Sequence, residues 1–219
     1  MISISVVIPA WNASRYIGDA IESALSQTAA PSEIIIVDDG SADDTSEFVR
    51  KFGSRVTLVA QVNPGPAAAR NRGIAEARGK AIALLDADDL MAPRRLELQG
   101  AVLSQDPNCA IVLGKQLTFR SEHVRVAISD ITIKPSAVRS GYVPSAAMIR
   151  ANAFVLVGQF DPALRIGDFL EWMVRAQREG VVPREIEQVV TYRRLHEGSL
   201  SRTAGADYAN LVHRLRKTT

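Results

Sequence analysis

Acidic side chains follow two apolar runs in the first half of the chain, at 33–37 and 81–85. These carboxylates are Asp38, Asp39, Asp86, Asp88 and Asp89. Carboxylates that gather in one crevice repel each other, so such a cluster is sensible only where a cation or several hydrogen-bond donors lie among them. Hard oxygen ligands select Mg²⁺ or Mn²⁺, and Mg²⁺ is commonly completed by substrate phosphates and water. The pattern therefore indicates a metal site that holds a phosphate-bearing substrate.

Each acidic cluster also has a simpler interpretation. Asp-x-Asp is an ordinary polar turn after a strand, although the third carboxylate, Asp89, is more acid than a turn needs. Asp39 and Ser41 belong to residue types that form turns and cap helices. Asp38 differs because it lies just inside the end of a predicted strand, where its carboxylate could accept the imide hydrogen of a uracil ring.

The sequence contains no glycine-rich phosphate loop. Neither Gly-x-x-x-x-Gly-Lys-Ser/Thr nor Gly-x-Gly-x-x-Gly occurs, which argues against kinase-like and Rossmann dinucleotide-binding proteins. The chain instead places Arg70 and Arg72 on an alanine-rich stretch that follows Asn63-Pro64-Gly65-Pro66. Both arginines cannot face the core, so one of them could reach a diphosphate or a base, and two solvated arginines are the alternative.

The elements that must position these residues alternate between strand and helix. Apolar runs predict four strands, at 3–8, 33–37, 56–60 and 81–85. Helical periodicity and start signals predict four helices, at 14–27, 41–52, 67–77 and 93–105, the second opened by a capping box of Ser41 and Asp44. The order indicates an α/β fold with a mainly parallel sheet flanked by helices. Strand ends then share one edge, where the polar clusters and the segment Pro9-Ala10-Trp11-Asn12 should converge.

The second half of the chain is less regular. Apolar runs predict three strands, at 110–119, 124–133 and 186–193. Helical periodicity predicts two helices, at 168–179 and 208–217. With no internal repeat, low-complexity segment or linker, we expect a single domain over 1–219.

Composition excludes several classes of protein. The 219 residues, 47% hydrophobic and 23% charged, fit one domain with a sizeable core. A net charge of +2 is too small for a nucleic-acid-binding surface. The single cysteine, Cys109, leaves no internal disulfide and fits a reducing compartment. The first residues carry no basic leader and no apolar run long enough for a signal peptide, so we expect a cytoplasmic protein.

Taken together, these segments resemble the glycosyltransferase family 2 enzymes, which have the GT-A fold, a Rossmann-like mixed and mainly parallel sheet. In the first half the matching segments are SVVIPAWN (5–12), IVDDGS (36–41), AARNRG (68–73) and LLDADD (84–89). In the second half they are VGQFD (157–161) and YRRLH (192–196). Each motif is weak alone, but their order and spacing are specific, and the resemblance covers nearly the whole chain.

The resemblance implies a role for individual residues. The positions that would bind the nucleotide sugar are Pro9, Ala10, Asn12, Asp38, Asp39, Arg70, Asp86 and Ala87. Among them, Pro9, Ala10 and Asp38 would surround the base and ribose. Asp88 resembles the ligand of a Mn²⁺ or Mg²⁺ ion on the diphosphate, and Asp86 would contact the ribose or the metal. His196, after the last strand, would approach the metal or diphosphate, with a surface histidine as the alternative.

The catalytic base implied by the resemblance is Asp168. The family usually shows Glu-Asp before this helix, whereas this chain has Gly167-Asp168, and the alternative role of Asp168 is a helix cap. One displacement with one base implies inversion at the sugar carbon. The Gln-x-x-Arg-Trp motif of processive members is absent, which indicates transfer of one sugar. The implied donor is a UDP-sugar, and the acceptor is a hydroxyl on a saccharide, a lipid-linked molecule or another compound.

Two other functions stay open at this stage. A sugar-1-phosphate nucleotidyltransferase uses a related sheet, but it normally carries a glycine-rich basic loop where this chain has Pro9-Ala10-Trp11-Asn12. A catalytically silent sugar-nucleotide-binding module is kept open by the missing Glu before Asp168.

In the transferase interpretation, 1–106 would bind nucleotide and metal, and 107–219 would bind the acceptor. The basic end around Arg214 and Lys217 would allow peripheral contact with the inner face of an anionic membrane, with a solvated end as the alternative.

Overall fold

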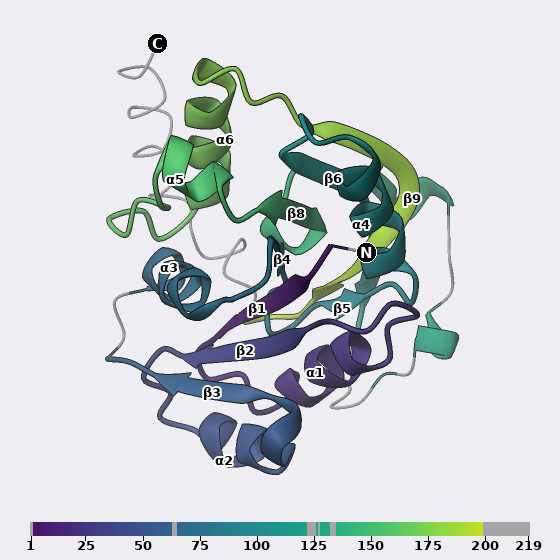
Figure 1. Cartoon of the computed structure of the whole chain (residues 1–219). Helices are drawn as coiled ribbons and strands as arrows, with labels where there is room; N and C mark the ends of the chain where they lie inside the picture. Colours follow the sequence, from purple (N-terminus) through teal and green to yellow (C-terminus); the bar gives the residue numbers. More distant parts are fainter. Residues whose placement is uncertain (1, 63–64, 122–125, 127, 132–134, 199–219) are drawn as a thin grey trace.

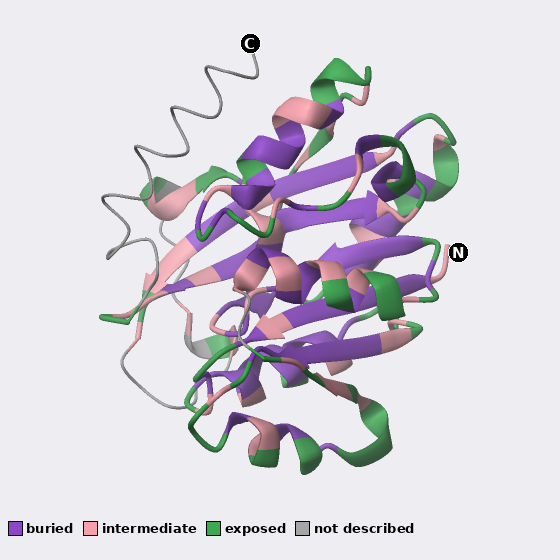
Figure 2. Cartoon of the chain, turned by 90° about the vertical axis from the view of Figure 1, so that its left-hand side faces the viewer, coloured by how far each residue is buried: buried purple, intermediate pink, exposed green. Residues whose placement is uncertain are grey.

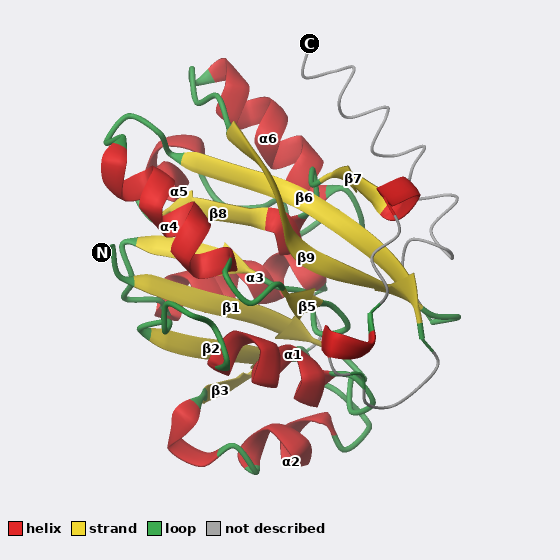
Figure 3. Ribbon diagram, turned by 90° about the vertical axis from the view of Figure 1, so that its right-hand side faces the viewer, coloured by secondary structure: helices red, strands yellow, loops and turns green. Residues whose placement is uncertain are grey.

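The computed structural model of the chain describes residues 2–62, 65–121, 126, 128–131 and 135–198 (Figure 1). Within these residues the strands form one nine-stranded sheet in the order β3-β2-β1-β4-β8-β6-β9-β5, with β7 paired to β6 outside this path. Helices cover both faces of the sheet (Figure 3). The α/β class that the alternation of elements predicts is therefore confirmed. None of the described helices has the length and apolar character needed to cross a bilayer.

The first half of the chain builds the parallel part of the sheet. Its strands are β1 (Ile4–Ala10), β2 (Glu33–Asp38), β3 (Thr57–Ala60) and β4 (Ala81–Leu84). β2 and β3 lie on one side of β1 and β4 lies on the other, so the winding reverses between β1 and β4. Ala10 lies opposite Asp38, and Asp38 lies opposite Ala60, so these strands end at one edge. Such a reversal is where open α/β sheets bind ligands.

The second half extends the sheet with strands of both directions. β8 (Ala147–Arg150) runs antiparallel between β4 and β6 (Ile111–Arg120), and β9 (Arg184–Leu195) runs parallel to β6. β7 (Val138–Ser140) pairs with β6, and β5 (Leu90–Met91) pairs with β9. Because β5 directly follows the acidic segment 86–89, the pairing of Leu90 with Tyr192 anchors that segment beside the end of β9.

The helices divide between the two faces. α1 (Ile17–Leu25), α2 (Thr45–Arg50) and α4 (Arg95–Gln105) pack on one face, and α3 (Pro66–Glu76), α5 (Ala153–Val157) and α6 (Asp168–Arg178) pack on the other. Figure 2 shows the buried sheet between the more exposed outer sides of these helices. The sequences of the central strands are continuous apolar runs because helices cover both faces of the sheet.

Gly73 explains how closely α3 approaches the sheet. A Cβ atom at this position would lie 2.4 Å from Cγ1 of Val7 on β1, closer than two carbon atoms can approach. The absence of a side chain at position 73 therefore lets α3, which carries Arg70, lie directly on β1.

Three sequence expectations need correction. The capping box of Ser41 and Asp44 does not form, because α2 begins only at Thr45 and the Asp44 side chain makes no capping hydrogen bond. α4 begins at Arg95 rather than at position 93. The strand expected at 124–133 contains the 3-10 turn Ile128–Asp130 instead. Ile128 and Ile131 both pack against the same cluster, and their spacing of three matches a 3-10 turn rather than a strand.

Several short elements were not predicted. They are β5, β7, β8, α5 and the 3-10 turns Gly53–Arg55, Pro135–Ala137 and Pro144–Ala146. Each is too short to show a period of its own, so its conformation depends on the strand or helix beside it. Part of the expected strand at 124–133 and the whole of the expected helix at 208–217 lie outside the described residues.

Candidate active site

The loops after β1 and β2 are joined by Asn12. Its side-chain oxygen accepts a hydrogen bond from the N–H of Ala42 at 2.8 Å, and its own N–H donates to Ser41 Oγ at 2.9 Å. Asn12 has a φ of 48°, in the left-handed region that asparagine tolerates better than most residues. These contacts explain why Ser41 does not cap α2. They also fix the loop that follows Pro9 and Ala10, the last two residues of β1, at the carboxyl edge of the sheet.

The Asp38 carboxylate is buried at the end of β2 and already accepts two hydrogen bonds. Oδ1 accepts from the N–H of Ser41 at 3.0 Å, and Oδ2 accepts from the Ser46 hydroxyl. Asp38 therefore has a turn-forming role of its own. Since a carboxylate oxygen can accept a second hydrogen bond, recognition of a uracil imide by Asp38 stays a prediction.

Asp39 faces the opposite way, toward the segment between β3 and α3. Its Oδ1 accepts from Gln61 Nε2 at 2.7 Å, and its Oδ2 accepts from the N–H of Gly65 at 3.0 Å. Burial raises the pKa of Asp39 and the Asp38 charge adds to this, while the two hydrogen bonds oppose the shift. Asp39 thus links the end of β2 to the start of α3.

Arg70 brings together two of the carboxylates singled out from the sequence. Its Nη1 lies 2.6 Å from Oδ2 of Asp168, and its Nη2 lies 2.7 Å from Oδ1 of Asp86. Both the Arg70 and Asp168 side chains are almost fully buried. The paired carboxylates raise the pKa of the Arg70 guanidinium against the effect of burial, so it stays charged. Arg72, by contrast, is exposed and pairs with Glu76 at 2.8 Å.

Asp168 is the first residue of α6 but does not cap it. The N-cap position is Gly167, with a φ of 73°, a left-handed conformation that favours glycine over the glutamate usual in the family. No side chain caps this helix end, and the Asp168 carboxylate pairs with Arg70 instead. The capping interpretation of Asp168 is therefore wrong.

The turn between β4 and β5 carries the remaining acidic residues. Asp88 and Asp86 are partly exposed, whereas Ala87 and Asp89 are buried. Oδ2 of Asp88 lies 3.0 Å from Nε2 of His196, directly after β9, so these two candidate metal ligands are adjacent. Burial raises the pKa of Asp89 well above its usual value, and the charges of Asp88 and Asp86 add to this. Asp89 thus belongs to the support of the turn rather than to its exposed face.

The protein side chains at this turn fit a cation whose coordination is completed by the substrate. Within the described part of the chain no three histidine, cysteine or acidic side chains converge on a position that could hold a metal by themselves. Asp88 and His196 offer one carboxylate oxygen and one imidazole nitrogen at a partly exposed position. Mg²⁺ and Mn²⁺ sites with one or two protein carboxylates are commonly completed by phosphate oxygens. These residues therefore suit a metal that binds together with a diphosphate.

Sequence reasoning missed a buried pair on α4 that supports this turn. The fully buried Arg95 donates to the carbonyls of Leu84 and Ala147 at 2.9 and 2.8 Å, and its Nε donates to Gln99 Oε1 at 3.0 Å. Burial lowers the pKa of Arg95 to about 9. Arg95 also donates to the carbonyl of Ser145, whose hydroxyl accepts from the N–H of Asp86 at 3.0 Å. The sequence signal that could have revealed this pair was an arginine and a glutamine one turn apart in the predicted helix.

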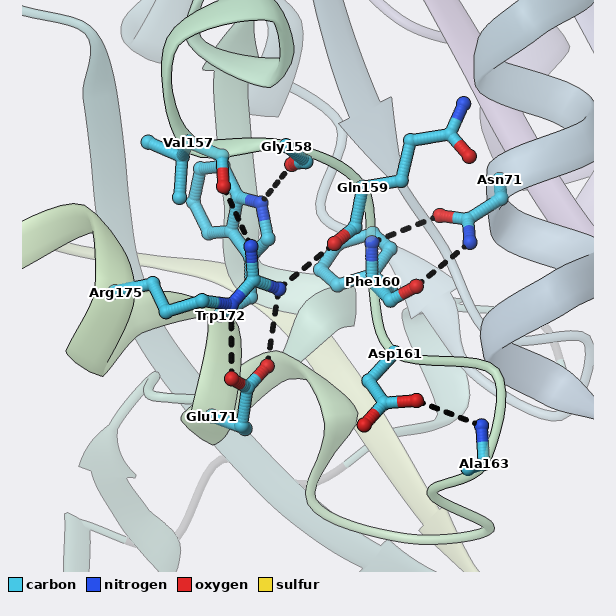
Figure 4. A network of polar contacts seen from close by, with 10 residues as sticks. All are labelled: Asn71, Val157, Gly158, Gln159, Phe160, Asp161, Ala163, Glu171, Trp172 and Arg175. Atoms are coloured by element: carbon cyan, nitrogen blue, oxygen red, sulfur yellow. Dashed lines mark hydrogen bonds and ion pairs between the residues drawn. The ribbon is translucent and has the colours of Figure 1, made fainter. Parts of the chain in front are cut away.

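A second network holds the base of α6 against α3, and Figure 4 shows it. The side-chain amide of Asn71, next to Arg70, pairs with both the carbonyl and the N–H of Phe160, at 2.8 and 3.0 Å. On α6, Trp172 Nε1 donates to the Gly158 carbonyl at 2.7 Å. Since Asn71 and Trp172 both hydrogen-bond to the segment 158–160, they fix the distance between the helices that carry Arg70 and Asp168.

Arg175 completes the network on the α6 side. It donates to the carbonyls of Val157 and Gln159 at 2.5 and 2.7 Å and forms two ion-pair contacts with Glu171, at 2.8 and 3.0 Å (Figure 4). Both oxygens of Glu171 are therefore committed to Arg175. This leaves Asp168 as the carboxylate at the start of α6 that faces Asp86 through Arg70.

The fold places the candidate residues in three groups. Arg70, Asp86 and Asp168 form one network. Asp88, two residues after Asp86 on the same turn, pairs with His196, which follows β9. The residues at the ends of β1 and β2 line the neighbouring part of the edge. The positions predicted to contact the nucleotide thus share one edge of the sheet, although their individual roles stay predictions.

Comparison with known proteins gives matches of sequence and of fold. The succinoglycan biosynthesis protein ExoO of Rhizobium meliloti (strain 1021) is 34% identical over 233 residues, covering 95% of this chain and 65% of that protein. An uncharacterized glycosyltransferase of Rickettsia felis is 48% identical over 98 residues, covering 44% of this chain and 16% of that protein. The chain thus spans less than two thirds of the length of these relatives.

Among solved structures, that of S. aureus TarS 1–349 in complex with UDP-GlcNAc superimposes with a TM-score of 0.70 at 20% identity, over 92% of this chain and 61% of that one. This similarity confirms the GT-A fold. The sequence model described as Glycosyl transferase family 2 matches residues 5–154, which is more than half of the chain. The chain therefore belongs to glycosyltransferase family 2.

Proposed function

We propose that the chain transfers one sugar from a UDP-sugar to an acceptor hydroxyl with inversion, using Mn²⁺ or Mg²⁺ on the diphosphate and Asp168 as general base. The observation that carries this proposal is Arg70, which lies between Asp168 and Asp86 at 2.6 and 2.7 Å. It joins the candidate base to the acidic turn that would hold the donor. Membership of the family and the similarity to TarS, solved with UDP-GlcNAc, support a UDP-sugar donor.

The geometry of Asp168 suits proton abstraction. Arg70 holds Oδ2, and among the described residues no donor hydrogen-bonds to Oδ1. Oδ1 can therefore accept the proton of the acceptor hydroxyl as its oxygen bonds to the sugar carbon. The bond from that carbon to the diphosphate oxygen breaks in the same displacement, so the configuration at the sugar carbon inverts. A positioned base of this kind contributes roughly 10²- to 10⁴-fold to the rate.

The donor would lie along the carboxyl edge of the sheet. Asp38, Pro9 and Ala10 would surround the base and ribose, and Asp86 would contact the ribose or the metal. Asp88 and His196 would hold the cation, which when bound supplies positive charge against the leaving diphosphate. Because Asp88 and His196 are already 3.0 Å apart, little rearrangement is needed for both to face one ion.

The acceptor would bind to the part of the chain that follows β4. The segment 158–167 leads directly to Asp168 at the start of α6, so we assign the acceptor hydroxyl to that side. The acceptor is a saccharide, a lipid-linked molecule or another hydroxyl compound, and reaction at the cytoplasmic face of the membrane would suit a lipid-linked one.

The test is incubation of the protein with UDP-sugars, Mn²⁺ and candidate acceptors, followed by NMR of the product. Release of UDP with an inverted glycosidic bond is the expected result. Pyrophosphate formation would instead identify a sugar-1-phosphate nucleotidyltransferase. Saturable UDP-sugar binding without turnover for any acceptor would identify a silent binding module.

A further inference from the structure

Arg194, near the end of β9, lies directly beneath the acidic turn. Its side chain is fully buried, and its Nη2 lies 2.8 Å from Oδ2 of Asp19, a buried carboxylate on α1. Its Nε donates to the backbone carbonyl of Asp88 at 3.1 Å, and its backbone N–H donates to Oδ1 of Asp89 at 3.0 Å. One residue thus binds two consecutive positions of the turn between β4 and β5.

Aromatic rings enclose the same guanidinium. The rings of Tyr16 and Phe119 lie 4.9 and 5.4 Å from the Arg194 guanidinium carbon. Tyr16 also contacts His196, with 4.5 Å between the ring centroids. Tyr16 immediately precedes α1, which carries Asp19, so the segment 16–19 contacts both Arg194 and the imidazole of His196.

These contacts link the two groups that would bind the metal. Asp88 comes from the turn after β4, and His196 comes from the end of β9, 108 residues later. Arg194 fixes the Asp88 backbone from below, while Tyr16 sits against the His196 ring. A planar guanidinium can reach the Asp19 carboxylate and the Asp88 carbonyl together, which a lysine ammonium on a flexible stem does not reproduce.

We propose that Arg194, paired with Asp19, is a positioning residue that holds Asp88 and His196 toward one cation. The inference rests on the proposed function, since it concerns the metal site assigned there. Groups that orient metal ligands from behind typically change metal affinity by about 10- to 100-fold when they are mutated. Arg194→Lys should therefore weaken UDP binding in the presence of Mn²⁺ by a factor of this size.

The experiment is calorimetric titration of UDP into wild type and Arg194→Lys, with and without Mn²⁺, together with thermal unfolding. The expected result is a loss of UDP affinity only in the presence of Mn²⁺, with uridine affinity close to wild type. The unfolding midpoint should fall, because lysine does not restore the buried contacts with Asp19 and the Asp88 carbonyl, but the protein should stay folded at the temperature of the titration. The matched control is Arg184→Lys, because Arg184 lies on the same strand and pairs with Asp106 at 2.8 Å but is 56% exposed and far along β9. Unchanged Mn²⁺-dependent affinity in Arg194→Lys would overturn the proposal. A parallel loss of uridine affinity would equally overturn it, since it would mark a purely structural role.

Amide hydrogen exchange can test the role of Arg194 even if the proposed function is wrong. If wild type binds UDP equally with and without Mn²⁺, the metal assignment is wrong, and exchange then decides the role of Arg194. The amide of position 194 donates to Asp89, so positioning predicts faster exchange there and at Asp89 itself in Arg194→Lys, with no change in Arg184→Lys. Equal exchange rates in the two variants would exclude the positioning role.

Discussion

Replacement of Asp168 by asparagine tests the catalytic assignment most directly. Asparagine has nearly the same size as aspartate and can still accept a hydrogen bond from Arg70 Nη1, which lies 2.6 Å from Asp168 Oδ2. Arg70 also keeps its pairing with Asp86 at 2.7 Å, so the guanidinium is not left without a counter-charge. The substitution therefore removes the proton acceptor while it preserves most of the surrounding geometry.

The expected sizes of the two effects differ. Exchange of a charge-assisted hydrogen bond for a neutral one should cost about 1 to 2 kcal/mol of stability. For a chain of this length that corresponds to a fall in the unfolding midpoint of roughly 2 to 8 °C. Loss of the general base should lower kcat by roughly 10²- to 10⁴-fold, which is about 2.7 to 5.4 kcal/mol in the barrier. The protein should thus remain folded at 25 °C while its turnover almost disappears.

The assay measures kcat and KM for the UDP-sugar by UDP release, with UDP affinity and the unfolding midpoint recorded on the same samples. Affinity for UDP should stay near wild type, because Asp168 is assigned to the acceptor side. Glu171→Gln is the matched control, since Glu171 lies on the same helix but commits both oxygens to Arg175 at 2.8 and 3.0 Å. Full turnover in Asp168→Asn with loss in Glu171→Gln would move the base to Glu171. Full turnover in both would refute the account of the acceptor side.

Three further predictions concern donor binding and the support of α6. Asp88→Asn should weaken UDP binding only when Mn²⁺ is present, and calorimetry that gives wild-type affinity with Mn²⁺ would contradict the metal assignment. Asp38→Ala should weaken metal-free uridine binding by about 1.5 to 3 kcal/mol, whereas Ser46→Ala, which removes only a hydrogen bond of the turn, should not; equal affinities would leave Asp38 as a turn residue. Asn71→Asp replaces the amide group that donates to the Phe160 carbonyl at 2.8 Å, so kcat should fall with little change in KM for the donor, and an unchanged kcat would show that this link does not align Asp168.

The sequence by itself determined the first half of the fold and the place of the site. β1, β2 and β4 are recognisable because strands covered on both faces are continuous apolar runs, and polar residues follow each of them. Parallel strands joined by helices end at a common edge, so convergence of Asn12, Asp38 and Asp86 there follows from local pattern alone. Asp168 and His196 were found through the resemblance of longer segments, not through periodicity.

Only the tertiary structure decided which of these residues meet. Arg70 and Asp168 are separated by 98 residues, and Arg194 and Asp19 by 175. Such pairings depend on the strand order and on the antiparallel insertion of β8, neither of which leaves a periodic signal in the sequence. The roles of Arg194 and Arg95 were hidden for the same reason, because a buried arginine and an exposed one look alike in sequence until the carbonyls and carboxylates that satisfy its charge are placed around it.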